Sequence, residues 1–135
     1  MIDRDSAIRV AAFRSDLLTF LRTSERIARA SGLTPQRHML LLMIKGAPDR
    51  SEQATVTDLC ARLGLAQSTI TELVRRAEEV GLLEREQSAL DGRVAHLRLT
   101  DEGERRLARA FASHRGERRR LHRLLLDLEV DGRRS

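Results

Sequence analysis

The sequence has few of the residues on which several protein classes depend. Its single cysteine, Cys60, excludes an internal disulfide and a multi-cysteine zinc site. It has three Phe and neither Trp nor Tyr, which argues against the aromatic platforms that bind single-stranded nucleic acid. The longest uncharged apolar run, Met39 to Ile44, is far shorter than the roughly 20 residues of a membrane span, and no secretion signal is visible. We therefore expect a soluble cytoplasmic protein without a membrane partner.

Arginine provides almost all of the positive charge in the sequence. The chain has 135 residues, 41% apolar and 33% charged, a composition typical of one globular domain. All of its 25 basic residues except Lys45 are arginine, and the net charge is +5. Such a charge is compatible with a nucleic acid partner, but residues 66–100 carry five basic and six acidic side chains, a net charge of −1. The positive excess lies in the flanking segments, so net charge alone does not indicate nucleic acid binding.

The first third of the chain predicts two helices. Apolar residues recur at three- and four-residue steps from Ser6 to Ala30, and Ser31-Gly32 then favours a left-handed helix end. Thr34-Pro35 begins a second helix with a side-chain cap and a proline in its first turn. That helix is apolar on nearly every side through Met39 to Ile44, so we expect it to be buried at the centre of the fold.

A helix-turn-helix pattern follows. A short helix begins with Thr57 as its predicted cap and ends at Gly64, and an amphipathic helix spans about Gln67 to Val80. At 100° per residue, this second helix has an apolar arc and an opposite polar face. The arc consists of Ile70, Leu73, Val74 and Ala77, and the polar face consists of Ser68, Glu72, Arg75 and Glu79, flanked by Thr71 and Arg76.

After Gly81 the apolar period changes to the alternation of strands. Segments 82–87 and 94–99 predict a hairpin with Asp91-Gly92 in its turn, and a hairpin directly after a helix-turn-helix is a wing. Thr100 then caps a helix that Gly116 interrupts or bends. A leucine stripe and a frayed polar tail from Asp131 complete the chain.

Several short segments occur together in a fixed order and spacing. They are Leu33-Thr34-Pro35-Gln36, the run from Thr57 to Leu65, the run from Gln67 to Val74, Gly81-Leu82-Leu83-Glu84-Arg85, and Asp91-Gly92-Arg93 followed by Leu99-Thr100 and Gly103. This set resembles the winged helix-turn-helix of the MarR (multiple antibiotic resistance regulator) family. The resemblance implies a homodimeric DNA-binding transcriptional regulator, a repressor, that binds a pseudo-palindromic double-stranded DNA operator. It also implies release by a small, often phenolic, effector of unknown identity.

The predicted architecture is mainly α with a small β-hairpin, arranged as a winged helix-turn-helix core flanked by N- and C-terminal dimerisation helices. The whole chain, 1–135, is expected to form a single MarR-like domain. Its predicted segments are an N-terminal dimerisation helix at 1–32, a second helix and loop at 33–53, the winged helix-turn-helix at 54–107 with its recognition helix at about 67–80 and its wing at about 82–99, and C-terminal dimerisation helices at 108–130.

The resemblance assigns DNA contacts to the recognition helix and the wing. The second helix of such a motif enters the major groove, and its predicted contact residues are Gln67, Ser68, Thr69, Thr71, Glu72, Arg75 and Arg76. By the same resemblance Arg93 enters the minor groove, and Asp91 holds its guanidinium by a salt bridge. The alternatives are a solvated polar face on the helix and a turn-stabilising Asp91–Arg93 ion pair without a role in DNA binding.

Two positions depart from the family pattern. Ala66 occupies the cap position where the family usually has Ser or Thr, and alanine cannot cap a helix. The family often has a basic residue at the position of Glu72 and an acidic one at that of Arg75, so the charges here are reversed. Glu72 can pair with Arg75 or Arg76 within the helix, or accept from a cytosine amino group. The base preference therefore stays open.

Apolar residues near both ends of the chain are the predicted dimer contacts: Ile8, Ala12, Leu121, Leu124, Leu125 and Leu128. These side chains can complete a monomer core, but two helices that extend beyond a compact winged helix have apolar faces that need a partner. A twofold dimer also places two recognition helices about one DNA turn apart. Arg14, Arg37 and His38 are candidates for lining an effector pocket between the lobes.

Other functions find little support in the residue pattern. No nucleophile elbow, phosphate-binding glycine loop or paired carboxylates indicate an enzyme, and no cofactor or metal site is expected. The four histidines are scattered, and Cys60 has the position of a small packing residue. The main alternative is a winged helix that has lost specific DNA binding and serves as a protein-interaction or dimerisation module.

Overall fold

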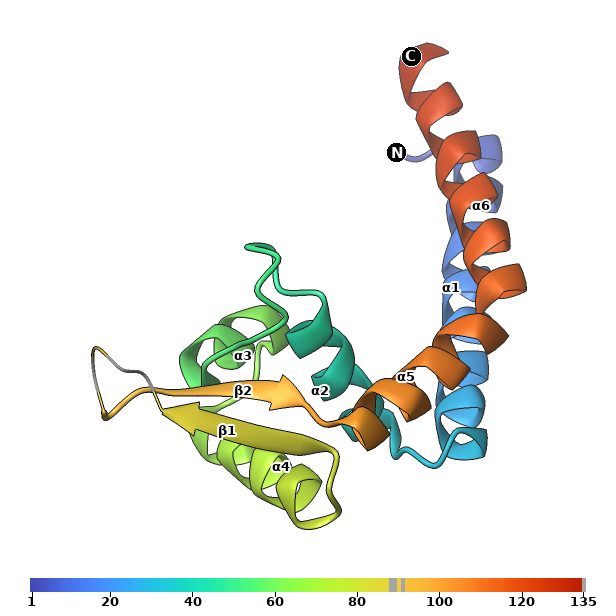
Figure 1. Cartoon of the computed structure of the whole chain (residues 1–135). Helices are drawn as coiled ribbons and strands as arrows, with labels where there is room; N and C mark the ends of the chain where they lie inside the picture. The colour runs from blue at the N-terminus through green and yellow to red at the C-terminus, as the bar shows by residue number, and fades with distance from the viewer. Residues whose placement is uncertain (88–89, 91, 135) are drawn as a thin grey trace.

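The computed structural model describes residues 1–87, 90 and 92–134, and these residues form helices and one antiparallel hairpin (Figure 1). In chain order the elements are α1 (Arg4–Ala30), α2 (Pro35–Lys45), α3 (Val56–Leu63), α4 (Gln67–Glu79), β1 (Leu83–Gln87), β2 (Ala95–Leu99), α5 (Asp101–Ser113) and α6 (Arg115–Arg134). The expectation of a mainly helical winged helix-turn-helix fold with a small hairpin is confirmed.

The chain has two parts, which we name the lobe and the arm. The lobe comprises α2, α3, α4 and the β1–β2 hairpin, and the arm comprises α1 and α6, which lie side by side (Figure 1). A salt bridge of 3.0 Å joins Arg120 Nη2 on α6 to Asp16 Oδ1 on α1. α5 leads from β2 to the arm.

The hydrophobic core lies inside the lobe. Its largest fully buried apolar side chains come from α2, α3, α4, the turn before β1, and β2: Leu40, Leu41, Ile44, Leu59, Ile70, Val74, Leu82 and Leu97. α2 is central, as the sequence predicts, but Met39 and Leu42 are 39% and 37% exposed. The expected burial of this helix does not hold for these two residues, which line a cavity shared with the arm.

The start of α3 differs from the sequence prediction by two residues. Thr55, and not Thr57, is the N-cap, and it forms a reciprocal capping box with Asp58. The Asp58 backbone N–H donates to Thr55 Oγ1 at 3.1 Å, and the Thr55 backbone N–H donates to Asp58 Oδ2 at 2.9 Å. A cap at Thr57 satisfies fewer donors, because Cys60, three residues later, has no carboxylate to complete the box.

The hairpin is joined to the segment that precedes the helix-turn-helix. Leu83 pairs with Leu99 at one end of the hairpin and Gln87 with Ala95 at the other. On the outer side of β2, the Leu97 backbone N–H donates to the Ala54 carbonyl at 2.8 Å, and the Ala54 N–H donates back at 3.1 Å. The wing is therefore attached directly to the start of α3.

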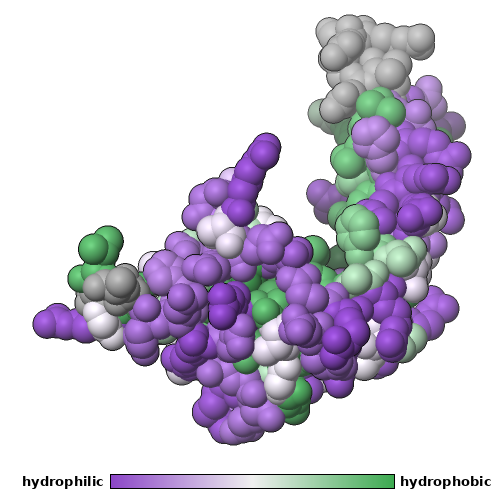
Figure 2. All heavy atoms as spheres, viewed as in Figure 1, coloured by the Kyte–Doolittle hydropathy of each residue, from purple (hydrophilic) through white to green (hydrophobic). Residues whose placement is uncertain are grey.

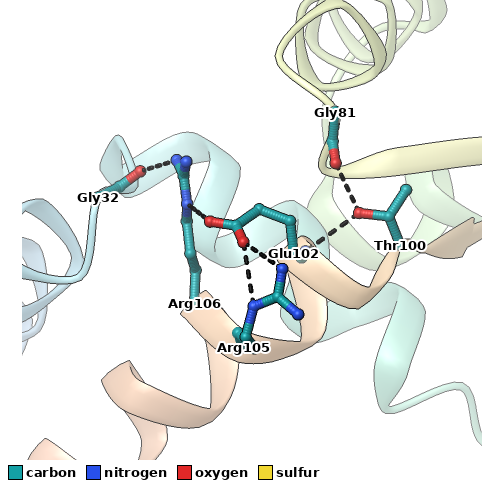
Figure 3. Close-up of polar contacts among 7 residues, drawn as sticks. Gly32, Gly81, Thr100, Glu102, Arg105 and Arg106 are labelled. Carbon is teal, nitrogen blue, oxygen red and sulfur yellow. Dashed lines mark hydrogen bonds and ion pairs between the residues drawn. The ribbon is translucent and has the colours of Figure 1, made fainter.

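Thr100 fixes the start of α5 against the turn that follows α4 (Figure 3), and Gly103 packs against the same turn. Thr100 Oγ1 donates to the Gly81 carbonyl at 2.6 Å and accepts from the Gly103 backbone N–H at 3.1 Å. A Cβ atom at Gly103 would lie 2.3 Å from the Leu82 carbonyl oxygen. This close approach of two backbones allows only glycine at the position.

A second anchor of α5 reaches the turn between α1 and α2 (Figure 3). Arg106 Nη1 donates to the Gly32 carbonyl at 2.8 Å. Glu102 accepts from Arg106 Nε at 2.7 Å and from Arg105 Nη2 at 2.6 Å. α5 therefore connects the turn between α1 and α2 with the turn that follows α4.

The break between the last two helices lies at His114, and not at Gly116 as the sequence predicts. His114 is 4% exposed, and its Nδ1 bonds to the Ala110 carbonyl oxygen at 2.8 Å. This buried ring lies at the break, whereas Gly116 lies inside α6 with open space around it. α6 continues to Arg134, which corrects the expectation of a frayed tail from Asp131.

Candidate nucleic-acid interface

α4 buries an apolar side and exposes a polar side, as predicted. Ile70, Val74 and Ala77 are fully buried against the core. The exposed side chains near the start of the helix are neutral: Gln67, Ser68, Thr69 and Thr71. Ala66 is the N-cap and makes no side-chain hydrogen bond, so it provides no acceptor for the first backbone N–H groups. Short polar side chains and helix amides are groups that bond phosphates or base edges.

A groove of about 270 Å³ lies between α4 and the hairpin. Gln67 and Thr71 line it from α4, Arg85 and Arg93 line it from the wing, and the start of α3 completes it. The structure thus brings predicted residues of the recognition helix and the wing to one surface. Asp91, the predicted partner of Arg93, lies outside the described residues.

The charged residues of α4 form an ion-pair network. Arg75 donates to Glu72 from Nε at 3.0 Å and from Nη2 at 2.6 Å, and its Nη1 pairs with Glu79. Arg76 donates from Nε to Glu72 Oε1 at 2.9 Å. Hydrogen bonds from Arg75 and Arg76 lower the pKa of Glu72 to about 2, so its carboxylate is ionised at neutral pH. Of the two options open to Glu72, the free protein adopts pairing within the helix.

Two arginines of the hairpin are also held by glutamates. Arg85 Nε donates to Glu78 Oε1 on α4 at 2.7 Å, and Arg98 Nε donates to Glu84 Oε1 across the strands at 2.8 Å. The first pair joins the recognition helix to the wing. Exposed pairs of this kind add little stability, but this one connects the two elements that form the groove.

Three residues near α4 were not identified as site residues in the sequence. Thr55 and Thr57 line the groove beside the wing, and Gln36 of α2 lines a second groove on the other flank of α4. The Thr-x-x-Asp spacing of the capping box is the one signal that marks Thr55. Gln36 gives no comparable signal, because only the packing of α2 beside α4 brings it to this surface.

A mostly apolar cavity of about 160 Å³ lies between the lobe and the arm. His38 of α2 stacks on His114, with ring centroids 5.5 Å apart and an interplanar angle of 3°. Burial, together with the neighbouring His114, lowers the pKa of His38. Of the three predicted pocket residues, His38 lines this cavity, and Arg14 and Arg37 do not. The apolar lining comes mainly from Phe20, Leu21, Met39, Leu42, Leu107 and Phe111.

Comparison with known proteins gives a family match for the central part of the chain. The family model of the MarR family matches the chain over residues 31–94, which span α2, the helix-turn-helix and the start of the wing. Residues 31–94 belong to the MarR family. A sequence search among curated proteins found no match.

Solved MarR family structures share the fold beyond this segment. AbsC, a MarR family transcriptional regulator from Streptomyces coelicolor, is 17% identical with a TM-score of 0.70, covering 95% of this chain and 83% of AbsC. A second MarR family regulator from that organism, solved in complex with DNA, is 20% identical with a TM-score of 0.68, covering 90% and 75%. A MepR mutant of S. aureus bound to an oligodeoxyribonucleotide is 18% identical with a TM-score of 0.68, covering 93% and 89%. At these identities the likeness establishes the MarR fold.

In this MarR fold the arm carries the predicted dimer residues. Ile8 and Leu125 are 59% and 45% exposed, and Ala12 is exposed as well. The other three predicted contacts are half-buried on α6: Leu121, Leu124 and Leu128. Figure 2 shows hydrophobic side chains along one edge of the arm, whereas the visible surface of the lobe is mostly hydrophilic. The arm thus has an apolar face that the chain itself leaves uncovered.

Cys60 is half-buried and packs against the core of the lobe, which agrees with its interpretation as a packing residue. In the part of the chain that the structure describes, no three His, Cys, Asp or Glu side chains are grouped as a metal site. The helices of that same part are each too short or too polar to span a bilayer.

Proposed function

We propose that the chain is a homodimeric, DNA-binding transcriptional regulator that represses transcription from a pseudo-palindromic operator. The observation that carries the proposal is the groove between α4 and the hairpin, where Gln67, Thr71 and Arg93 share one surface. A major groove admits an α-helix, and a wing beside that helix reaches the adjacent minor groove. A helix and a hairpin side by side therefore match the shape of duplex DNA.

The two parts of this surface have chemistry suited to different grooves. Amide and hydroxyl groups at the start of α4 bond base edges or phosphates in the major groove, and the proposed contacts there are Gln67, Ser68, Thr69 and Thr71. The charged residues Glu72, Arg75 and Arg76 belong to the same proposed DNA surface. Arg93 suits a minor groove, because narrow A·T-rich grooves concentrate negative potential. Asp91 is proposed to orient the Arg93 guanidinium.

The dimer is proposed from the uncovered apolar face of the arm. Ile8, Leu18 and Leu125 are 59%, 53% and 45% exposed there, and a twofold axis lets a second copy cover the same face. This arrangement places the two α4 helices about one DNA turn, roughly 34 Å, apart. Two proteins of this fold have been solved with DNA, which supports the assignment.

The cavity between the lobe and the arm is proposed as the effector site. Its lining is mostly apolar, with His38 and Arg118 among its polar groups, so it suits a small apolar molecule with a polar substituent. Because both α2 and α6 line the cavity, an occupant changes how the lobe sits on the arm. The spacing of the two α4 helices then changes, and the operator is released.

Selection from a library of randomised duplexes tests the DNA-binding part of the proposal. The purified protein is expected to enrich an inverted repeat, and affinity for that duplex should fall steeply with salt as counterions are released. A reporter gene placed behind the enriched sequence should be repressed when the protein is expressed. An intact dimer that enriches no sequence would instead support a winged-helix module for protein interaction or dimerisation.

A further inference from the structure

The two arginines of α4 differ in how many of their nitrogens are already bound. Arg75 donates from Nε, Nη1 and Nη2, and its acceptors are Glu72 and Glu79. Arg76 donates from Nε to Glu72, and within the described part of the chain its Nη1 and Nη2 have no hydrogen-bond partner. Arg75 is therefore enclosed by carboxylates, whereas the terminal edge of Arg76 is open.

Arg76 lies in a shallow groove of about 370 Å³ on the flank of α4. Gln36 of α2 and Thr69 of α4 line the same groove, and both have neutral polar side chains. Glu72 also borders it, but Arg75 and Arg76 together bind both of its carboxylate oxygens. At 100° per residue, Arg76 and Thr69 lie on the opposite flank of α4 from Thr71, which faces the wing.

We propose that Arg76, with Gln36 and Thr69, binds a DNA backbone phosphate in this groove, and that Arg75 makes no phosphate contact. The inference rests on the proposed function, because it assigns one part of the proposed DNA surface. Nη1 and Nη2 of a guanidinium form a fork that matches two phosphate oxygens. The bond from Arg76 Nε to Glu72 leaves this fork open.

Arg75 is excluded from the same role by its own hydrogen bonds. It must break its bonds to Glu72 and Glu79 before it can donate to a phosphate. Its positive charge is balanced by these two carboxylates. Arg75 therefore neutralises the surface that Arg76 uses.

Two single substitutions on the same helix test the assignment. Arg76→Ala and Arg75→Ala remove the same charge from side chains that are 61% and 53% exposed, so each is the control for the other. Arg76→Ala should weaken binding to the selected duplex and to a random duplex alike, by about tenfold. It should also reduce the slope of log affinity against log salt by about one per protomer. Arg75→Ala should leave the slope unchanged and the affinities within about twofold.

A third variant tests the groove itself. Gln36→Ala should weaken binding to both duplexes by about threefold without changing the salt slope, because an amide carries no charge. An equal loss of slope in both arginine variants, or no loss in Arg76→Ala, overturns the assignment, provided that circular dichroism shows folded variants. If the wild-type protein itself binds neither duplex in a salt-dependent way, the proposed function fails, and the assignment fails with it.

Discussion

The lobe and the arm differ in how their apolar side chains are buried. In the lobe, Leu40, Leu41 and Ile44 of α2 are completely enclosed by elements of the same chain. In the arm, Ile8 and Leu125 keep about half of their surface exposed, at 59% and 45%. The lobe therefore completes a core from one chain, whereas the arm has an apolar face suited to a second copy.

Charge is also distributed unevenly along the chain. Residues 66–100, which contain α4 and the hairpin, have a net charge of −1, and residues 1–65 and 101–135 carry ten basic and seven acidic residues each. The proposed DNA surface is thus the least positive part of the chain. DNA binding then depends on where a few arginines lie, such as Arg93, and not on the total charge.

The largest effect is expected from a methyl group placed in the backbone contact of the lobe. Gly103→Ala puts a Cβ atom 2.3 Å from the Leu82 carbonyl oxygen, so the start of α5 must shift. We expect a loss of about 3 kcal/mol in the free energy of unfolding, measured by urea denaturation. Gly116→Ala in the arm meets open space and should gain about 0.5–1 kcal/mol from helix propensity. Equal changes in the free energy of unfolding for Gly103→Ala and Gly116→Ala would contradict this difference between the close backbone contact at Gly103 and the open space at Gly116.

A charge on the arm should separate the dimer without unfolding the lobe. Leu125→Asp places a carboxylate on the exposed apolar face of α6, where a second copy would have to bury it without a partner. Sedimentation velocity should show a monomer. Thermal denaturation should show an unchanged unfolding transition of the lobe. Leu65→Asp, at a leucine in the lobe that is 40% exposed, is the control and should remain dimeric. A dimeric Leu125→Asp protein would remove α6 from the interface.

The junction between the two regions should weaken in acid. Burial lowers the pKa of His38 from its ordinary value of 6.5, so the unfolded chain binds the proton more tightly than the folded one. The stabilisation is complete above pH 6.5 and is lost as the pH falls toward the folded-state pKa. Urea denaturation should show a decline of at most about 1.4 kcal/mol per pH unit in this window.

Replacing the buried ring tests the origin of that decline. His38→Gln should flatten the dependence of unfolding free energy on pH, because the titrating group is removed. His122→Gln, at an exposed position of α6, is the control and should keep the wild-type slope. The same slope in all three proteins would assign the acid sensitivity to other groups.

The smallest effect is expected at Glu72, which lies on the exposed face of α4. Exposed ion pairs contribute little to stability, so Glu72→Gln should leave the melting temperature almost unchanged. Removing a negative charge should raise the affinity for all duplexes alike, because Glu72 is bound to Arg75 and Arg76 and not to a base. A loss of preference at one C·G pair in a repeated selection would show that Glu72 reads cytosine instead.

Local patterns in the sequence predict most of the fold. The apolar arc of α4 and the alternation in β2 follow from short-range periodicity, and the missing cap at Ala66 follows from its residue type. The predicted helix ends are wrong where contacts between residues far apart in the sequence lie at the end of a helix. The helix break falls at His114 and not at Gly116, and the buried ring of His114 stacks on His38 of α2. Helix ends of this kind depend on tertiary packing, which a single sequence does not reveal.

The candidate site is predictable to a similar degree. Spacing of three and four residues correctly indicates the pairing of Glu72 with Arg75 and Arg76. The position of Gln36 beside α4 and the stacking of His38 on His114 join segments far apart in the sequence. No periodicity connects such segments, so these parts of the site become visible only in the fold.

The most direct test of the account is a titration of the selected duplex and a random duplex with wild-type protein and Arg93→Ala. The wild-type dimer should bind the selected duplex at least about 10³-fold more tightly than the random one. Arg93→Ala should weaken binding to the selected duplex by about tenfold, with the dimer mass unchanged. Equal wild-type affinity for both duplexes, or an Arg93→Ala protein that binds the selected duplex like the wild type, would contradict it.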